Sequence, residues 1–158
     1  MTSPRAVSTI TVLILISCLS GVVLANDAGS GGDAGGTTST AVWLPANSST
    51  YYGNLNASND TDDYYAVNMT NNTGIAVGLT SPSGADFDLW LYSSSGSSID
   101  SSFSTSSYDS VSSNGTSVGG STVYIRVDQW TGSGQYTLQV WIFSTSSSGG
   151  GGGSSQND

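Results

Sequence analysis

All the acidic residues of this chain are aspartates, eleven in number, and the sequence contains no glutamate, lysine or histidine. Aspartates that gather in loops are suited to holding a hard cation, because calcium takes oxygen ligands only. Two groups stand out, a pair in a Gly-rich stretch and a cluster in a later turn: Asp27 and Asp33, and then Asp60, Asp62 and Asp63. We expect calcium at these positions, whereas zinc is excluded by ligand type. The alternative is that the second cluster only forms the turn, since Asp is favoured there.

A further acidic pair, Asp86 and Asp88, alternates with the apolar residues Phe87 and Leu89 of a predicted strand. This alternation places the two carboxylates on the outer face of the sheet. Arg126 occupies the corresponding outward position of a later strand, so we expect a structural ion pair between Arg126 and Asp88. A metal role for the acidic pair is the alternative.

The charge of the chain bears on its partners. The formal net charge is −9, and nucleic-acid binding requires a basic face, so nucleic acid is not an expected partner. We also expect no enzyme activity, because serines need a neighbouring base and the sequence offers neither His nor Lys. Paired carboxylates that hydrolyse glycosides need a cleft, and nothing in this short sequence indicates one.

Two sets of residues suggest contacts at the surface. Aromatic residues recur at outward positions of the predicted strands, where they would stack on sugars or be buried against other subunits, unless loops cover them: Tyr64, Trp90, Tyr92, Tyr124 and Trp141. Six N-x-Ser/Thr sequons are candidate glycosylation sites, the alternative being an unmodified Asn-rich surface: Asn47, Asn56, Asn59, Asn68, Asn71 and Asn114.

The chain divides into four parts by composition. Residues 1–25 read as a signal peptide with Arg5 before a short apolar run, and lipoprotein processing at Cys18 is the alternative. Residues 26–40 form a Gly/Asp-rich linker that contributes to the metal site, residues 41–143 the folded domain, and residues 144–158 a flexible Ser/Gly tail. We therefore expect a secreted or cell-surface protein without a membrane span in its mature chain.

The folded part shows apolar residues at every second position and no helical period. Tyr65 and Val67, Phe87 and Leu89, and Val123 and Ile125 each share one face of a predicted strand. Period two with frequent turn signals predicts an all-β, antiparallel β-sandwich. Within the Ser-rich stretch 93–121, residues 108–113 are the best strand candidate.

Three stretches carry a resemblance to a known family: DTDDYYAV (60–67), GADFDLWLY (84–92) and VYIRVDQWTGSGQYTLQV (123–140). In order and spacing they are similar to the signature of the bacterial pre-peptidase C-terminal domain, which is related to collagen-binding modules of collagenases. The resemblance implies a jelly-roll-like sandwich of about eight strands. It also implies a calcium ion between the linker and the turn, which points to Asp27, Asp33, Asp60 and Asp63.

These expectations lead to a function. We expect a non-catalytic, calcium-stabilised structural module that assembles with copies of itself into a glycosylated cell-surface filament or layer. The alternatives are a secreted module that binds a polysaccharide or a collagen-like polymer, and an accessory domain of a protease.

Overall fold

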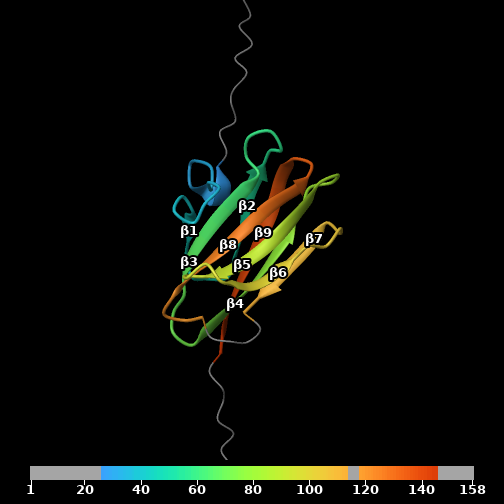
Figure 1. The fold of residues 1–158 in the computed structure, drawn as a ribbon. Coiled ribbons are helices and arrows are strands. Elements are labelled where there is room, and N and C mark those ends of the chain that lie inside the picture. Colours follow the sequence, from blue (N-terminus) through green and yellow to red (C-terminus); the bar gives the residue numbers. More distant parts are fainter. Residues whose placement is uncertain (1–25, 114–117, 146–158) are drawn as a thin grey trace, which may run out of the picture.

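Nine strands form two facing sheets in the computed structural model, which describes residues 26–113 and 118–145 (Figure 1). The expected signal peptide, Asn114 and residues 146–158 of the expected tail lie outside the described residues. The elements in chain order are the 3-10 turn η1 (Asp27–Gly29), β1 (Val42–Leu44), β2 (Ser49–Leu55), β3 (Asp62–Asn68), β4 (Thr73–Thr80), β5 (Asp86–Ser93), β6 (Ser98–Ser102), β7 (Tyr108–Ser112), β8 (Thr122–Thr131) and β9 (Gly134–Ser144).

The predicted sandwich is confirmed. One sheet has the strand order β1-β3-β8-β5-β6 and the other has the order β2-β9-β4-β7. Neighbouring strands run antiparallel except for β1, which pairs parallel with β3 through Val42 and Tyr65. This parallel strand was not predicted from the sequence, because three residues are too few to show a period.

The core lies between the sheets and follows the predicted alternation. Tyr65 and Val67 of β3 are fully buried, as are the inward-facing apolar residues of β5 and β8 on the same sheet: Phe87, Leu89, Leu91, Val123, Ile125 and Val127. Leu138 of β9 and Ile75 of β4 meet them from the other sheet. Burial of every second residue is the pattern expected where two sheets pack face to face.

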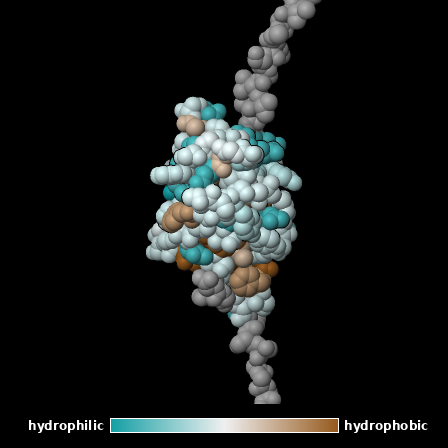
Figure 2. All heavy atoms as spheres, turned by 90° about the vertical axis from the view of Figure 1, so that its right-hand side faces the viewer, coloured by the Kyte–Doolittle hydropathy of each residue, from teal (hydrophilic) through white to brown (hydrophobic). Residues whose placement is uncertain are grey.

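One face of the molecule is largely polar. Figure 2 shows a largely pale and teal face with hydrophobic residues gathered toward its lower end. Within the described part of the chain, no helix has the length and apolar character needed to span a membrane.

The N-terminal segment is held against the end of the sandwich where β3 begins. Ala28 and Gly29 in η1 adopt left-handed backbone conformations, with φ of 52° and 74°, which turn the chain tightly. The amide of Tyr64 donates to the carbonyl of Gly35 at 3.1 Å. Figure 1 shows this segment at the opposite end of the sandwich from the end of β9. The fold thus brings the linker aspartates to the first residues of β3.

Candidate metal site

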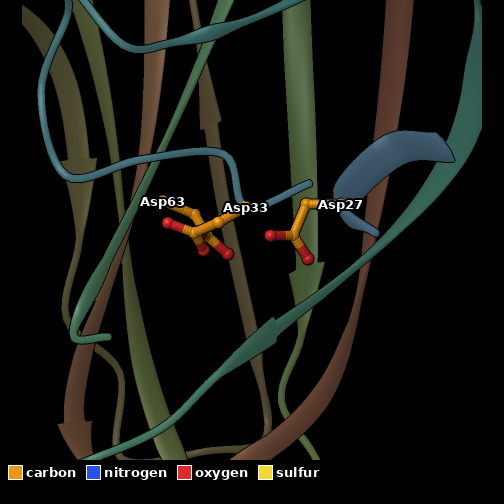
Figure 3. A group of neighbouring side chains, drawn as sticks. All are labelled: Asp27, Asp33 and Asp63. Atoms are coloured by element: carbon orange, nitrogen blue, oxygen red, sulfur yellow. The ribbon is translucent and has the colours of Figure 1, made fainter. Parts of the chain in front are cut away.

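Three aspartates from separate segments meet at this end of the sandwich (Figure 3). Asp27 belongs to η1, Asp33 to the loop that follows, and Asp63 to β3. One carboxylate oxygen from each lies within 4.8 Å of the others. Asp27 and Asp63 are buried, while Asp33 is exposed. The structure therefore brings together three of the five aspartates predicted to bind metal.

Asp27 is fixed by the backbone around it. Its Oδ2 accepts a hydrogen bond from the amide of Ala34 at 3.0 Å, and its Oδ1 accepts one from the amide of Asn54 at 2.8 Å. Burial raises the pKa of Asp27, and the two amides oppose that rise by stabilising the carboxylate. The side chain thus joins the N-terminal segment to β2 and holds its charge in place.

Asp63 lies deepest in the group. Its Oδ2 accepts a 2.5 Å hydrogen bond from the hydroxyl of Tyr136, which is itself 2.6 Å from the hydroxyl of Tyr65. Its Oδ1 is buried and has no hydrogen-bond partner among the described residues. Burial, together with the charges of Asp27 and Asp60, raises the pKa of Asp63 to about 8.

Asp60 lies close to the three carboxylates but outside the 4.8 Å group. It is held in the turn before β3 by a bridge to Asn56, whose amide donates to the carbonyl of Asp60 at 2.7 Å. Burial and the charges of Asp33 and Asp27 raise its pKa to about 6. Four carboxylates therefore share one site, and nothing positive among the described residues pairs with them.

Asp62, which was also predicted to bind the metal, lies outside the group of three carboxylates. Successive side chains of a strand point to opposite faces, so Asp62 projects outward while Asp63 projects inward. Asp62 accepts a hydrogen bond from Nε of Arg126 at 2.5 Å. Its carboxylate is therefore engaged on the outer face of the sheet.

The prediction that Arg126 pairs with Asp88 is wrong. The second partner of Arg126 is Asp128, at 3.2 Å. In the sheet, Arg126 lies opposite Tyr64 and Trp90, whereas Asp88 lies opposite Asp128. Alternation along the strands predicts the correct face for Arg126 and Asp88, but it carries no information about register.

Asp27, Asp33 and Asp63, which we call the metal-site group, offer the ligands of a site for a hard cation. Carboxylate oxygens are the ligands that calcium prefers, and a bound cation would neutralise charges that now repel each other. The buried, unpartnered Oδ1 of Asp63 is the observation that tests the fit, since a buried carboxylate oxygen without a partner is costly. On this evidence the residues fit a divalent cation.

Sequence reasoning missed the two tyrosines that support Asp63. Tyr65 shares the face of its strand with Val67, and Tyr136 alternates in the same way with Leu138. A buried tyrosine hydroxyl needs a partner, so the signal was present in the sequence. Their hydroxyls lie against Gly53 of β2, where an added Cβ would come within 2.2 Å of the Tyr136 oxygen. Gly53 thus leaves the space that the two hydroxyls occupy.

The predicted aromatic surface is only partly open. Trp90 is half-buried: it stacks on Tyr92 at 5.8 Å between ring centroids and meets Phe103 edge-on at 4.6 Å. Tyr64 and Tyr124 are also half-buried, while Trp141, on the other sheet, is 41% exposed. These residues do not form one platform, since the five positions are divided between the two sheets.

The sequons within the described residues all have exposed asparagines: Asn47, Asn56, Asn59, Asn68 and Asn71. Exposure makes them accessible to modification, and their occupancy stays a prediction. Asn56 and Asn59 border an open groove of about 960 Å³ that runs from the metal-site group along β2.

No protein-family model and no curated protein matches the sequence. Among solved structures, the pre-peptidase C-terminal domain of a collagenase from Bacillus anthracis is similar, with 17% identity over 63% of this chain and 92% of that chain and a TM-score of 0.52. A weaker likeness is to a mitogen from Yersinia pseudotuberculosis, with 15% identity over 60% of this chain and 85% of that chain and a TM-score of 0.47. Another is to a periplasmic inhibitor of g-type lysozyme from Aeromonas hydrophila, with 14% identity over 65% of this chain and 96% of that chain and a TM-score of 0.43. The resemblance to the pre-peptidase C-terminal domain is thereby confirmed at the level of the fold.

Proposed function

We propose that this protein is an exported, non-catalytic β-sandwich module that calcium stabilises. The observation that carries the proposal is the convergence of Asp27, Asp33 and Asp63, whose oxygens lie within 4.8 Å of one another. These three residues would hold the ion, and Asp60 is close enough to contribute. The ion supplies positive charge to a site that has none of its own.

The position of the site suggests what the ion does. Asp27 and Asp33 belong to the N-terminal segment, and Asp63 belongs to the sandwich. Without a cation, four carboxylates repel one another across this junction; with one, the same charges join the segment to the first residues of β3. The amide of Asn54, which donates to Asp27 at 2.8 Å, ties β2 into the same junction.

Thermal unfolding in calcium and in chelator tests the proposal. A ligand at one hundred times its Kd adds about 2.7 kcal/mol of stability, which corresponds to a rise in Tm of about 10 °C for a domain of this size. Asp63→Asn is expected to abolish the rise, while Asp100→Asn, remote from the site, is expected to retain it. An equal Tm in calcium and in chelator would falsify the metal assignment.

The lack of catalytic machinery supports a non-catalytic role. The sequence has no His or Lys to activate its many serines. Three carboxylates with raised pKa values, Asp27, Asp60 and Asp63, occur together at the junction, where cation binding accounts for them. Secretion and glycosylation complete the proposal, and mass spectrometry of the protein from its native host tests both.

Self-assembly is a second candidate, and one edge of the sandwich favours it. Natural sheets protect their edges with short strands, irregular pairing or inward charges. Among the described sheets, β1 has three residues, β6 pairs with β5 through a register shift, and β7 carries Asp109. β2 is an edge of seven residues without charge, proline or register shift.

The outer side of β2 has hydrogen-bonding groups to offer. The amide of Asn54 points away from β9, since it donates to Asp27. Amides two and four residues earlier point the same way, so those of Thr50 and Tyr52 face the open groove. An extended segment from another copy would complete this edge.

Sedimentation of the protein in calcium tests assembly, because the ion would hold in place the N-terminal segment that lines the groove. Tyr52→Pro removes an amide that β9 does not use, so it is expected to leave Tm nearly unchanged and to reduce association. Tyr52→Phe keeps the amide and serves as the control. A wild-type protein that stays monomeric at high concentration rules this candidate out in favour of a polymer-binding module.

A further inference from the structure

A second acidic site lies on the sandwich at a different position from the metal-site group. Asp86, Asp88, Phe103, Thr105 and Trp130 line a hollow of about 420 Å³. The residues come from the start of β5, the connection between β6 and β7, and the end of β8. No residue is shared with the proposed calcium site, so either proposal can be wrong without affecting the other.

No described basic residue forms an ion pair with the carboxylates of this hollow, although the charge of Arg126 acts on Asp88 from a distance. Oδ1 of Asp86 is buried and has no hydrogen-bond partner among the described residues. Burial and the neighbouring charges of Asp86, Asp128 and Asp109 raise the pKa of Asp88 to about 6. Arg126, the only basic residue in the described part of the chain, is engaged by Asp62 and Asp128.

Asp109, which does not line the hollow, adds a further negative charge that acts on Asp88. It is 1% exposed, and its Oδ1 accepts hydrogen bonds from the hydroxyl of Ser102 and from the amide of Ser104 at 2.9 Å. Its Oδ2 is buried without a partner among the described residues. Uncompensated carboxylates in a partly desolvated hollow destabilise the free protein, and a ligand of opposite charge relieves that cost.

The walls of the hollow are aromatic. Trp130 is 72% exposed and Phe103 is 55% exposed, although both are large apolar side chains. The ring of Phe103 packs edge-on against that of Trp90, with 4.6 Å between the ring centroids, and this contact holds Phe103 in position. Aromatic faces attract cations, and Trp does so best. Carboxylates together with aromatic walls are suited to an ammonium or a guanidinium group.

We propose that the hollow between Phe103 and Trp130 receives a lysine or arginine side chain of a partner protein, with Asp86 and Asp88 meeting its charge. A second copy of this chain does not fit as the partner, because its sequence has no lysine and only Arg5 and Arg126. A neutral sugar would stack on the aromatic residues but would leave the carboxylates uncompensated. The net charge of −9 also attracts a basic partner over distance.

Nitrogen-15 NMR of the calcium-loaded protein tests this proposal, with the indole N–H of Trp130 as the reporter. The probes are acetyl-Gly-Gly-Lys-Gly-Gly-amide, its Arg analogue and its Gln analogue. We expect the Lys and Arg peptides to shift the Trp130 signal with a Kd on the order of 1–10 mM, as a single contact implies, and the Gln peptide not to shift it. Added salt is expected to weaken binding, because the attraction is electrostatic.

Variants distinguish specific binding in the hollow from nonspecific binding to exposed aromatic residues. The double variant Asp86→Asn, Asp88→Asn is expected to bind the Lys peptide about tenfold more weakly. The Kd is read from the same Trp130 signal. Trp130→Phe, read from the amide signals around it, is expected to retain most of the binding. Trp43→Ala, at another exposed tryptophan outside the hollow, is expected to retain all of it. Equal binding of the Gln peptide, no shift with any peptide, or a shift caused by cellohexaose in their place overturns the proposal.

Discussion

The hydroxyl of Tyr136 donates a 2.5 Å hydrogen bond to the carboxylate of Asp63, and the bond joins the two sheets of the sandwich, since Tyr136 is in β9 and Asp63 in β3. Both residues are buried. One contact therefore connects the metal-site group to the core.

In the presence of calcium, where Asp63 is ionised, Tyr136→Phe is expected to lower the free energy of unfolding by about 2 kcal/mol, the usual value for a buried hydrogen bond to a charged group. It is also expected to weaken calcium binding, because one oxygen of Asp63 loses the donor that orients it. Chemical denaturation and calcium titration measure the two effects. Tyr51→Phe, at a half-buried tyrosine of β2, is the control.

Gly53→Ala is expected to destabilise the protein by about 2–3 kcal/mol, within the range for overpacking a core. The added Cβ would lie 2.2 Å from the Tyr136 hydroxyl oxygen and 2.7 Å from that of Tyr65, so both rings must move. Gly32→Ala, where nothing lies within 4 Å of the added atom, is expected to change stability by less than about 0.5 kcal/mol. Equal stability of the two variants contradicts the packing described for Gly53.

Asp62→Asn is expected to leave the calcium-dependent rise in Tm unchanged, whereas Asp33→Asn reduces it. Asp62 faces Arg126 on the outer side of β3, at 2.5 Å, and takes no part in the metal-site group. Its pair is partly exposed, so its loss is expected to cost no more than about 1 kcal/mol. Thermal unfolding of both variants, with and without calcium, provides the comparison.

In calcium-free buffer, stability is expected to fall as pH rises from about 4 to about 8 and then to level off. Asp63 has a pKa of about 8 in the folded protein, which is above its unfolded value. The folded state therefore binds more protons in this interval, and its advantage is lost as pH rises through the folded pKa. Asp60, with a pKa of about 6, contributes in the same direction.

Calcium is expected to reverse this trend, because the ion binds the ionised carboxylates and protons compete with it. Scanning calorimetry across the interval, with and without calcium, measures both curves. A calcium-free protein whose Tm rises from pH 4 to pH 8 contradicts the site geometry described for Asp63.

The sequence was most informative where alternation decides the outcome. It placed Tyr65 and Phe87 in the core and Asp88 and Arg126 on the outer face, because period two separates the faces of a strand. It did not predict which outward residues become neighbours, since register depends on turns and on both sheets together. For the same reason it included Asp62 in the metal site, although the alternation that buries Tyr65 also separates Asp62 from Asp63.

The cluster was predicted from residue type, and the structure brings Asp27, Asp33 and Asp63 of it together, whereas its support by two tyrosines was missed. Asp27 and Asp33 lie 30 or more positions from Asp63 along the chain, and nothing local in the sequence joins them. Asp109 went unnoticed as well, although it alternates with Val111 on the inward face of β7. A carboxylate at a core position is a signal that sequence reasoning can use.

The parallel strand β1 has a consequence for how the molecule opens. It pairs with β3 alone, through Val42, Trp43 and Leu44, and it follows directly on the segment that carries Asp27 and Asp33. Residues 26–44 can therefore open as a unit that breaks no antiparallel strand pair, although it withdraws Ala34 and Leu44 from the core. Native-state hydrogen exchange is expected to show the amides of Ala34 and Tyr64 opening at a lower free energy than those of β8. In that case calcium governs a local equilibrium, and it determines whether this unit is part of the folded domain or an extended arm.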